Sequence, residues 1–155
     1  MGSGSTVKTV VVSGAAHGFG RCIAETFAQL GTRFGCDLCA AELAETAKAG
    51  FNTQVLHLTD RAVAAAWIAQ IEQTTGGAVD VLVNNADGVA EQQMHPIEQV
   101  PDTDWDRVLR GQHRCRLRVE PCNGGGVKRA GSGRIDNIRS GAGLGPSLTG
   151  IRADR

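Results

Sequence analysis

The most informative stretch of the chain is residues 7–20, which read VKTVVVSGAAHGFG. Its first six residues are mostly β-branched and apolar, which is typical of a parallel strand covered on both faces. Glycines follow at once, at Gly14, Gly18 and Gly20, and a helical pattern begins among them. A strand, a glycine-rich turn and a helix N-terminus in this order can bind a pyrophosphate through free backbone amides.

Strand-like and helix-like segments alternate outward from this stretch. We expect further strands at residues 33–38, 53–58 and 79–83, and helices at 19–30, 40–49 and from Asp60, as the cap, to about residue 74. Short connections between such elements predict an open parallel sheet with helices on both faces. The expected strand order is 3-2-1-4, with a fifth strand only loosely attached beside the fourth.

The predicted fold class is therefore α/β, a Rossmann-like doubly wound parallel sheet that is incomplete at its C-terminal end. We divide the chain into a flexible N-terminal lead (1–6), a dinucleotide-binding domain (7–109) and an irregular basic tail rich in Gly and Arg (110–155). One strand-like piece lies in the tail, at 134–140. It contains Asp136, whose carboxylate would be costly to bury, so either that face of the sheet stays open or the strand does not dock.

Charge separates the two halves of the chain. The sequence has 16 basic and 16 acidic side chains, but residues 1–109 carry 6 and 13 of them, whereas residues 110–155 carry 10 and 3. Clustered positive charge attracts nucleic acid. The tail has no Phe, Trp or Tyr on which bases could stack, so we expect disorder there and no nucleic-acid partner.

The remaining composition excludes several other classes of protein. Five cysteines, an odd number at irregular positions, predict reduced thiols and neither a disulfide framework nor a metal site. No apolar stretch approaches the roughly 20 residues that a membrane span needs. The N-terminus also lacks an apolar signal core, and we therefore expect a cytoplasmic protein without a membrane partner.

Four segments resemble the short-chain dehydrogenase/reductase family. Residues 13–20 are similar to its Thr-Gly-x-x-x-Gly-x-Gly fingerprint, with Ser13 in place of threonine. Asn84-Asn85-Ala86-Asp87 looks like its Asn-Asn-Ala-Gly after the fourth strand. Residues 104–109 resemble the start of its interface helix, and residues 140–144 resemble the segment that begins with its catalytic serine.

This resemblance implies a nicotinamide cofactor, hydride transfer and a small alcohol or carbonyl as substrate. Ser140 is the implied catalytic residue, which would hydrogen-bond the substrate oxygen. The candidate cofactor-binding residues are Ser13, Gly14, His17, Gly18, Phe19, Gly20, Asp37, Leu38, Leu58, Asn84, Asn85 and Ala86.

Asp37 predicts which nicotinamide cofactor is used. It follows Gly14 by 23 residues, at the end of the expected second strand. A carboxylate there can accept hydrogen bonds from the adenosine ribose, whereas the 2′-phosphate of NADP would meet like charge, at a cost of about 1–4 kcal/mol at ~4 Å. We therefore expect NAD in preference to NADP.

The family's active site also holds a tyrosine and, four residues later, a lysine. The sequence contains no tyrosine, and the expected position falls near Ala153, just before the end at Arg155. Positioned proton transfer is typically worth about 10²–10⁴-fold in rate, so we expect cofactor binding with impaired or no turnover. The alternative is a non-catalytic dinucleotide-binding or interaction module.

The family pattern is interrupted at residues 110–130. Pro121 and the glycines at 124–126 make a single helix there improbable, because an interior proline costs about 3 kcal/mol and each glycine about 1. One interpretation is a shifted reading frame or a sequence error within a C-terminally truncated dehydrogenase. Because relatives often associate through this crossover helix, homo-oligomerisation is left open, as is the substrate.

Overall fold

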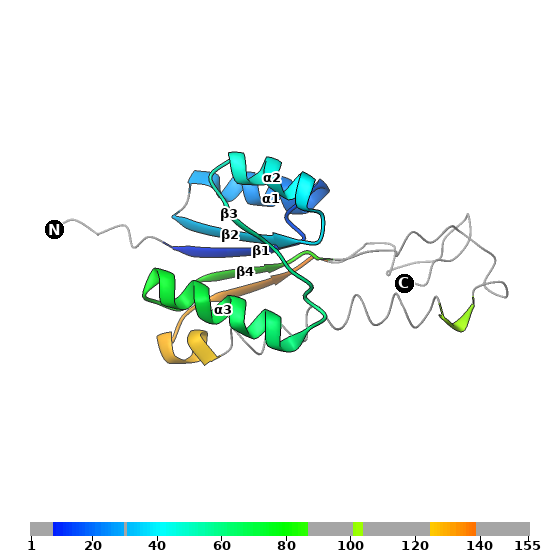
Figure 1. Cartoon of the computed structure of the whole chain (residues 1–155). Helices are drawn as coiled ribbons and strands as arrows, with labels where there is room; N and C mark the ends of the chain where they lie inside the picture. Colours follow the sequence, from blue (N-terminus) through cyan, green and yellow to red (C-terminus); the bar gives the residue numbers. More distant parts are fainter. Residues whose placement is uncertain (1–7, 30, 87–100, 104–124, 139–155) are drawn as a thin grey trace, which may run out of the picture.

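Five parallel strands form one sheet in the order β3-β2-β1-β4-β5 (Figure 1). A computed structural model describes residues 8–29, 31–86, 101–103 and 125–138. The strands are β1 (Thr9–Ser13), β2 (Thr32–Asp37), β3 (Asn52–Val55), β4 (Val81–Asn84) and β5 (Arg134–Asn137). The helices are α1 (Gly18–Thr26), α2 (Ala40–Lys48) and α3 (Arg61–Thr75), with a 3-10 turn η1 (Phe27–Gln29) after α1. The α/β class and the predicted strand order are confirmed.

The sheet is covered on both faces, as the sequence of β1 predicts. Helices α1 and α2 lie on one side and α3 on the other (Figure 1). Val10 and Val12 pack in one cluster with Leu43 of α2, whereas Val11 packs in the other with Trp67 of α3. Alternate residues of a strand point to opposite faces, so a strand between two helical layers carries apolar residues on both faces.

Helix α3 begins and ends where the sequence places its signals. The Asp60 carboxylate accepts hydrogen bonds from the backbone N–H of Ala62 at 2.8 Å and of Val63 at 3.3 Å, which is the expected cap. The helix ends at Gly76, whose φ of +71° favours glycine. Four residues at helical spacing face the sheet and are buried, namely Ala64, Trp67, Ile68 and Ile71.

Strand β5 pairs with β4 more closely than expected. All four of its residues are in parallel register with β4, and Asp136 lies opposite Val83. The side chains of β5 are nevertheless exposed, Asp136 among them. The strand therefore docks and its faces stay open, which spares the carboxylate from burial.

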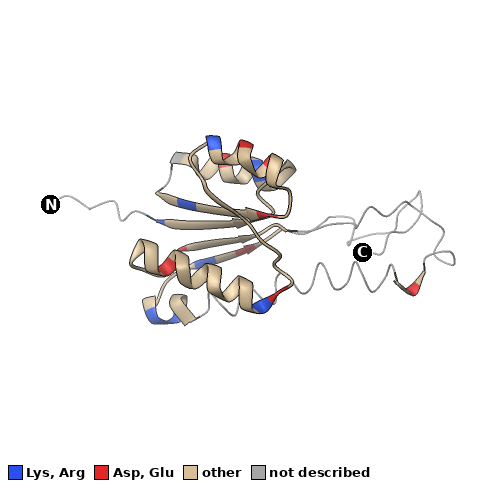
Figure 2. Cartoon of the chain, in the orientation of Figure 1, with Lys and Arg blue, Asp and Glu red and all other residues tan. Residues whose placement is uncertain are grey.

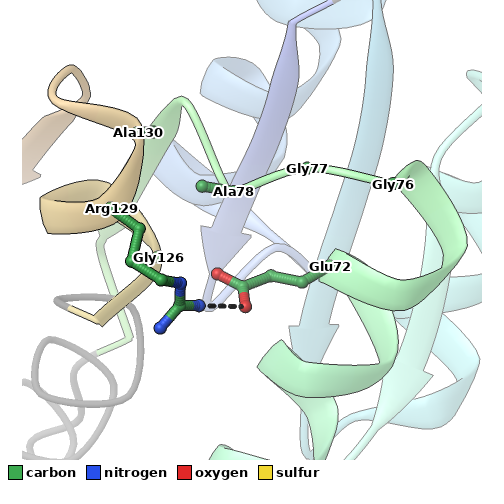
Figure 3. A pocket seen from close by; sticks show the side chains of 7 residues that line it. All are labelled: Glu72, Gly76, Gly77, Ala78, Gly126, Arg129 and Ala130. Carbon is green, nitrogen blue, oxygen red and sulfur yellow. Dashed lines mark hydrogen bonds and ion pairs between the residues drawn. The ribbon is translucent and has the colours of Figure 1, made fainter.

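Residues 125–130 are helical and lie beside α3 (Figure 1), although irregular backbone was expected there. Packing explains the difference, since it often overrides helix propensity. Gly126 is buried, and a Cβ at this position would meet the Glu72 carboxylate and lie 3.1 Å from Cβ of Ala78 (Figure 3). Residues 1–7, 104–124, with Pro121, and 139–155, with Ser140, lie outside the described residues.

Charged residues lie mainly on the helices, and of the five strands β2 and β5 carry them (Figure 2). Within the described residues, every helix is too short or too polar to cross a membrane.

Candidate functional site

The candidate site lies where three strands end at the carboxyl edge of the sheet. Ser13 ends β1, Asp37 ends β2 and Asn84 ends β4. The register places Ser13 beside Cys36 on one side and Asn84 on the other. The chain leaves β1 toward β2 and returns on the opposite side as β4, so this is the point where strand order reverses. Open α/β sheets bind ligands at such points.

The glycines that follow β1 let the turn pack closely against its neighbours. Gly14 has a φ of +69°, and a Cβ there would lie 2.8 Å from Cα of Ala86. Gly18 also has a positive φ, of +54°. Gly20 is needed for a different reason, because a Cβ on it would overlap the carbonyl oxygen of Gly14. The turn can therefore close on the first turn of α1 only with these residues in place.

Ser13 joins the end of β1 to the residues after β4. Its side chain is buried, and Oγ accepts hydrogen bonds from the backbone N–H of Asn85 and of Ala86, both at 3.1 Å. The same hydroxyl donates to the Val83 carbonyl at 3.3 Å. Nδ2 of Asn85 donates to the Gly14 carbonyl at 3.1 Å. The structure thus brings the two predicted motifs, the glycine turn and the Asn-Asn-Ala segment, into direct contact.

The Asp37 carboxylate holds two pieces of backbone at this edge. Oδ2 accepts from the Ala16 N–H at 3.0 Å, and Oδ1 accepts from the N–H of Leu38 at 2.7 Å and of Cys39 at 3.2 Å. A carboxylate offers about four acceptor positions, so these three bonds leave capacity for one more donor. Asp37 is half-buried, so part of the residue is accessible to solvent.

The N-terminus of α1 is open. His17 is its N-cap residue, with an exposed side chain that makes no capping hydrogen bond, and the first turn holds no acidic side chain. The first N–H groups of a helix lack partners inside the helix and favour an anion. Two apolar side chains at this edge are well exposed, Phe19 at 80% and Leu38 at 60%. These features suit a ligand with a charged bridge and flat apolar rings.

Leu58 and Asn84, like Ser13, have buried side chains. Leu58 packs in the hydrophobic cluster beneath α3 with Trp67 and Ile68. Asn84 is 2% exposed, and its Nδ2 donates to Oδ1 of Asn137 on β5 at 3.0 Å. The side chains of Leu58 and Asn84 are therefore part of the protein interior, whereas those of His17, Phe19 and Leu38 are exposed to solvent.

Two side chains at this site were not predicted from the sequence. Arg21 donates through Nη2 to the Ala16 carbonyl and, at 2.9 Å, to the Glu42 carbonyl. Thr46 is fully buried and donates to the Ala15 carbonyl at 2.7 Å. The signal for Thr46 was available: it follows Leu43 by three residues on the buried face of an otherwise Ala- and Glu-rich helix, and a buried hydroxyl needs a partner.

Other predicted features bear less on this site. Ser140 lies outside the described residues. Among the described residues, Cys22, Cys36 and Cys39 form no disulfide with one another. In the part of the chain that the structure describes, no three His, Cys, Asp or Glu side chains gather as a metal-ligand set.

A glycine turn that opens onto a helix N-terminus, at the reversal point of a parallel α/β sheet, defines the class of Rossmann-like nucleotide-binding folds. Comparison with known families is more specific, because the model of the family described as short chain dehydrogenase matches residues 8–151. The chain belongs to the short-chain dehydrogenase family. Membership implies a nicotinamide cofactor for the family's oxidoreductase chemistry.

Individual relatives agree with this assignment. The chain is 34% identical over 151 residues to the D-beta-hydroxybutyrate dehydrogenase of Rhizobium meliloti (strain 1021), covering 88% of this chain and 55% of that protein. It is 32% identical over 143 residues to the D-threitol dehydrogenase of Mycolicibacterium smegmatis (strain ATCC 700084 / mc(2)155), covering 86% and 52%.

A solved structure described as ribose-5-phosphate isomerase from Brucella melitensis 16M superposes with a TM-score of 0.81 at 29% identity. The match covers 90% of this chain and 54% of that one. The chain therefore spans about half the length of the relatives it matches. The names of these relatives describe different reactions, so the likeness supports the family and the fold, and no particular substrate.

Proposed function

We propose that this chain binds a nicotinamide dinucleotide at the carboxyl edge of β1, β2 and β4, and prefers NAD to NADP. The pyrophosphate would lie at the open N-terminus of α1, next to Gly18, Phe19 and Gly20. The observation that carries the proposal is the pair of contacts that closes the turn, Ser13 Oγ with the Asn85 N–H and Asn85 Nδ2 with the Gly14 carbonyl. These contacts hold the turn that leads into α1, which would reduce the ordering cost of binding.

The preference for NAD is argued from Asp37. Its carboxylate has acceptor capacity beyond its three backbone bonds, which suits a ribose hydroxyl. A 2′-phosphate at the same place would be repelled by about 1–4 kcal/mol, depending on the effective dielectric constant.

The reaction proposed by lineage is hydride transfer between the cofactor and a small alcohol or carbonyl, with Ser140 as the hydrogen-bond partner of the substrate oxygen. A bound nicotinamide ring would supply or accept the hydride. The 155 residues contain no tyrosine, so they offer no phenol for proton transfer. We therefore propose cofactor binding with impaired or no turnover for this polypeptide. A non-catalytic dinucleotide-binding or interaction module is the second candidate, and the same lack of tyrosine favours it.

Titration with NADH and NADPH tests the binding proposal. The wild-type chain is expected to bind NADH at least about tenfold more tightly than NADPH. Asp37→Ala is expected to bring the two affinities close together. This substitution also removes the acceptor of the Ala16 N–H. That change should weaken the binding of both nucleotides equally, so it cancels in the ratio of their affinities. A chain that binds neither nucleotide, or an Asp37→Ala variant with the wild-type ratio, contradicts the proposal.

Glu45→Gln is the matched control for Asp37→Ala, because it removes one carboxylate of the same charge from α2. Glu45 is exposed, and the hydrogen bond and the charge of Lys48 hold its pKa below the ordinary value, so it is ionised at neutral pH. The ratio of NADH to NADPH affinity should not change in Glu45→Gln.

An activity assay separates the enzyme from the binding module. D-beta-hydroxybutyrate and D-threitol are suitable first substrates, because two relatives are named for them. NADH binding without turnover supports the module. A rate above about 1 s⁻¹, the low end for typical enzymes, supports a working dehydrogenase.

The proposed location is the cytoplasm, where cysteines stay reduced. The proposed partners are small molecules, with no nucleic acid and no membrane. Sedimentation of the purified chain would decide whether it forms a homo-oligomer.

A further inference from the structure

The middle of the glycine turn is fixed entirely by protein groups. Ala15 and Ala16 are both fully buried. The Ala15 N–H donates to the Cys36 carbonyl at 3.1 Å, and the Ala15 carbonyl accepts from Thr46 Oγ1 at 2.7 Å. The Ala16 N–H donates to Asp37 Oδ2 at 3.0 Å, and the Ala16 carbonyl accepts from Arg21 Nη2. Every backbone polar group of these two residues thus has a partner within the chain.

This arrangement limits which amides can meet a pyrophosphate. The N–H groups of Ala15 and Ala16 are committed to β2 and cannot bind a ligand without losing those bonds. The donors left for an anion are those that follow Ala16, at the N-terminus of α1. Their direction depends on how the Ala16 peptide is held, because the next residue, His17, is the N-cap of α1.

Arg21 holds the Ala16 peptide group through its carbonyl oxygen. Its Nη2 bridges the Ala16 carbonyl and the Glu42 carbonyl, so one guanidinium links the turn, α1 and α2. Within the described structure its Nε is buried without a hydrogen-bond partner. An unsatisfied buried donor costs stability. An arginine at this position is therefore better explained by the geometry that it imposes than by a gain in stability.

We propose that Arg21 is a positioning residue for the diphosphate part of the ligand. By holding the Ala16 carbonyl against α2, it fixes the orientation of the helix N-terminal amides before the ligand arrives. Thr46 performs the same task one residue earlier, at the Ala15 carbonyl. The inference rests on the proposed dinucleotide binding, and the experiment below separates the failure of the two.

The experiment compares ligands with and without the diphosphate. Calorimetry measures the dissociation constants of NADH, ADP and adenosine. The proteins compared are the wild-type chain, Arg21→Met, Arg21→Lys and the control Arg61→Met. The control removes an exposed positive charge at the start of α3. In Arg21→Met, the affinity for NADH and for ADP is expected to fall by about tenfold, and the affinity for adenosine by less than about twofold. Arg21→Lys should recover part of the loss, and Arg61→Met should bind like the wild-type chain.

Thr46→Val distinguishes positioning from simple attraction between Arg21 and phosphate. This variant keeps the shape of the side chain and changes no charge, but it removes the donor to the Ala15 carbonyl. Positioning predicts the same selective loss of ADP affinity in Thr46→Val. Direct attraction predicts no loss in Thr46→Val, and that result overturns the inference.

The remaining outcomes are equally decisive. Wild-type ADP affinity in Arg21→Met, or an equal loss for ADP and adenosine, overturns the positioning role and leaves the proposed function standing. If the wild-type chain binds neither NADH nor ADP, the proposed function itself fails. If Arg21→Met does not fold, the ratio of ADP to adenosine affinity in Arg21→Lys decides: a lower ratio than in the wild-type chain supports the inference, and an unchanged ratio overturns it.

Discussion

Ser13 and Asn85 lie 72 positions apart in the chain, and the Asn85 backbone N–H donates to Ser13 Oγ at 3.1 Å. The Ala86 N–H donates to the same oxygen at the same distance. One buried hydroxyl therefore satisfies two backbone donors at the point where the chain leaves β4. This explains why a hydroxyl side chain and an Asn-Asn-Ala segment, far apart in the sequence, form a single candidate site.

Ser13→Ala is expected to lower the free energy of unfolding by about 1–3 kcal/mol, because it leaves two part-buried N–H groups without their acceptor. Ser13→Thr keeps the hydroxyl and should retain most of the stability. Urea denaturation of the three proteins measures the difference. Equal stability of Ser13→Ala and the wild-type chain would show that the hydroxyl does not hold the β4 turn.

Gly20→Ala is expected to prevent the glycine turn from closing. A Cβ at residue 20 would overlap the Gly14 carbonyl and lie 2.5 Å from Asn85 Nδ2, both of which belong to the site. Nucleotide affinity should fall by more than about tenfold, and the melting temperature should fall as well. Gly77→Ala is the control, because nothing lies within 4 Å of a Cβ there. Nucleotide binding by Gly20→Ala at the wild-type level would contradict the close packing described here.

Local sequence patterns were sufficient to predict the sheet. The apolar run of β1 and the Asp60 cap each report on a short piece of chain, and the structure agrees with both. Strand order followed because alternating strands and helices with right-handed crossovers allow few topologies. The pairing of β5 was underestimated, since local composition does not reveal that exposed side chains on both faces are compatible with a complete backbone ladder.

The site was predicted less completely, for a physical reason. Glycines at a strand-to-helix turn carry a local signal, so that turn could be recognised. Arg21 and Thr46 act through contacts with carbonyls that only the folded chain brings near them. Asp37 was predicted to bind the cofactor, but its bonds to Ala16, Leu38 and Cys39 depend on how β2 lies beside the turn. Such contacts are set by tertiary structure and leave little trace in spacing.

Asp60→Ala tests the helix cap independently of the site. Losing the bonds to the Ala62 and Val63 N–H groups should cost about 1 kcal/mol, which corresponds to a fall of about 2–4 °C in the melting temperature. Nucleotide affinity should not change. Asp60→Asn keeps an acceptor oxygen and should melt close to the wild-type chain. If it melts as early as Asp60→Ala, the negative charge at the helix N-terminus matters more than the hydrogen bonds.

Glu72 of α3 forms an ion pair with Arg129 of the helical segment 125–130 (Figure 3). These residues line a shallow pocket of about 400 Å³, and the closest approach of their charged groups is 3.5 Å. The Arg129 side chain is 74% exposed, so solvent screens the pair, and such pairs contribute about 0–1 kcal/mol. Arg129→Ala should therefore change the free energy of unfolding by less than about 1 kcal/mol.

Glu72→Gln is the sharper variant of this pair. Among the described atoms, Oε1 of Glu72 is buried without a hydrogen-bond partner, so the carboxylate is incompletely compensated for its loss of water. Replacing it with a neutral amide should leave stability unchanged or raise it slightly. Urea denaturation at low and high salt measures both variants. A loss above about 2 kcal/mol in either would show that the ion pair, and not backbone packing around Gly126, attaches residues 125–130 to α3.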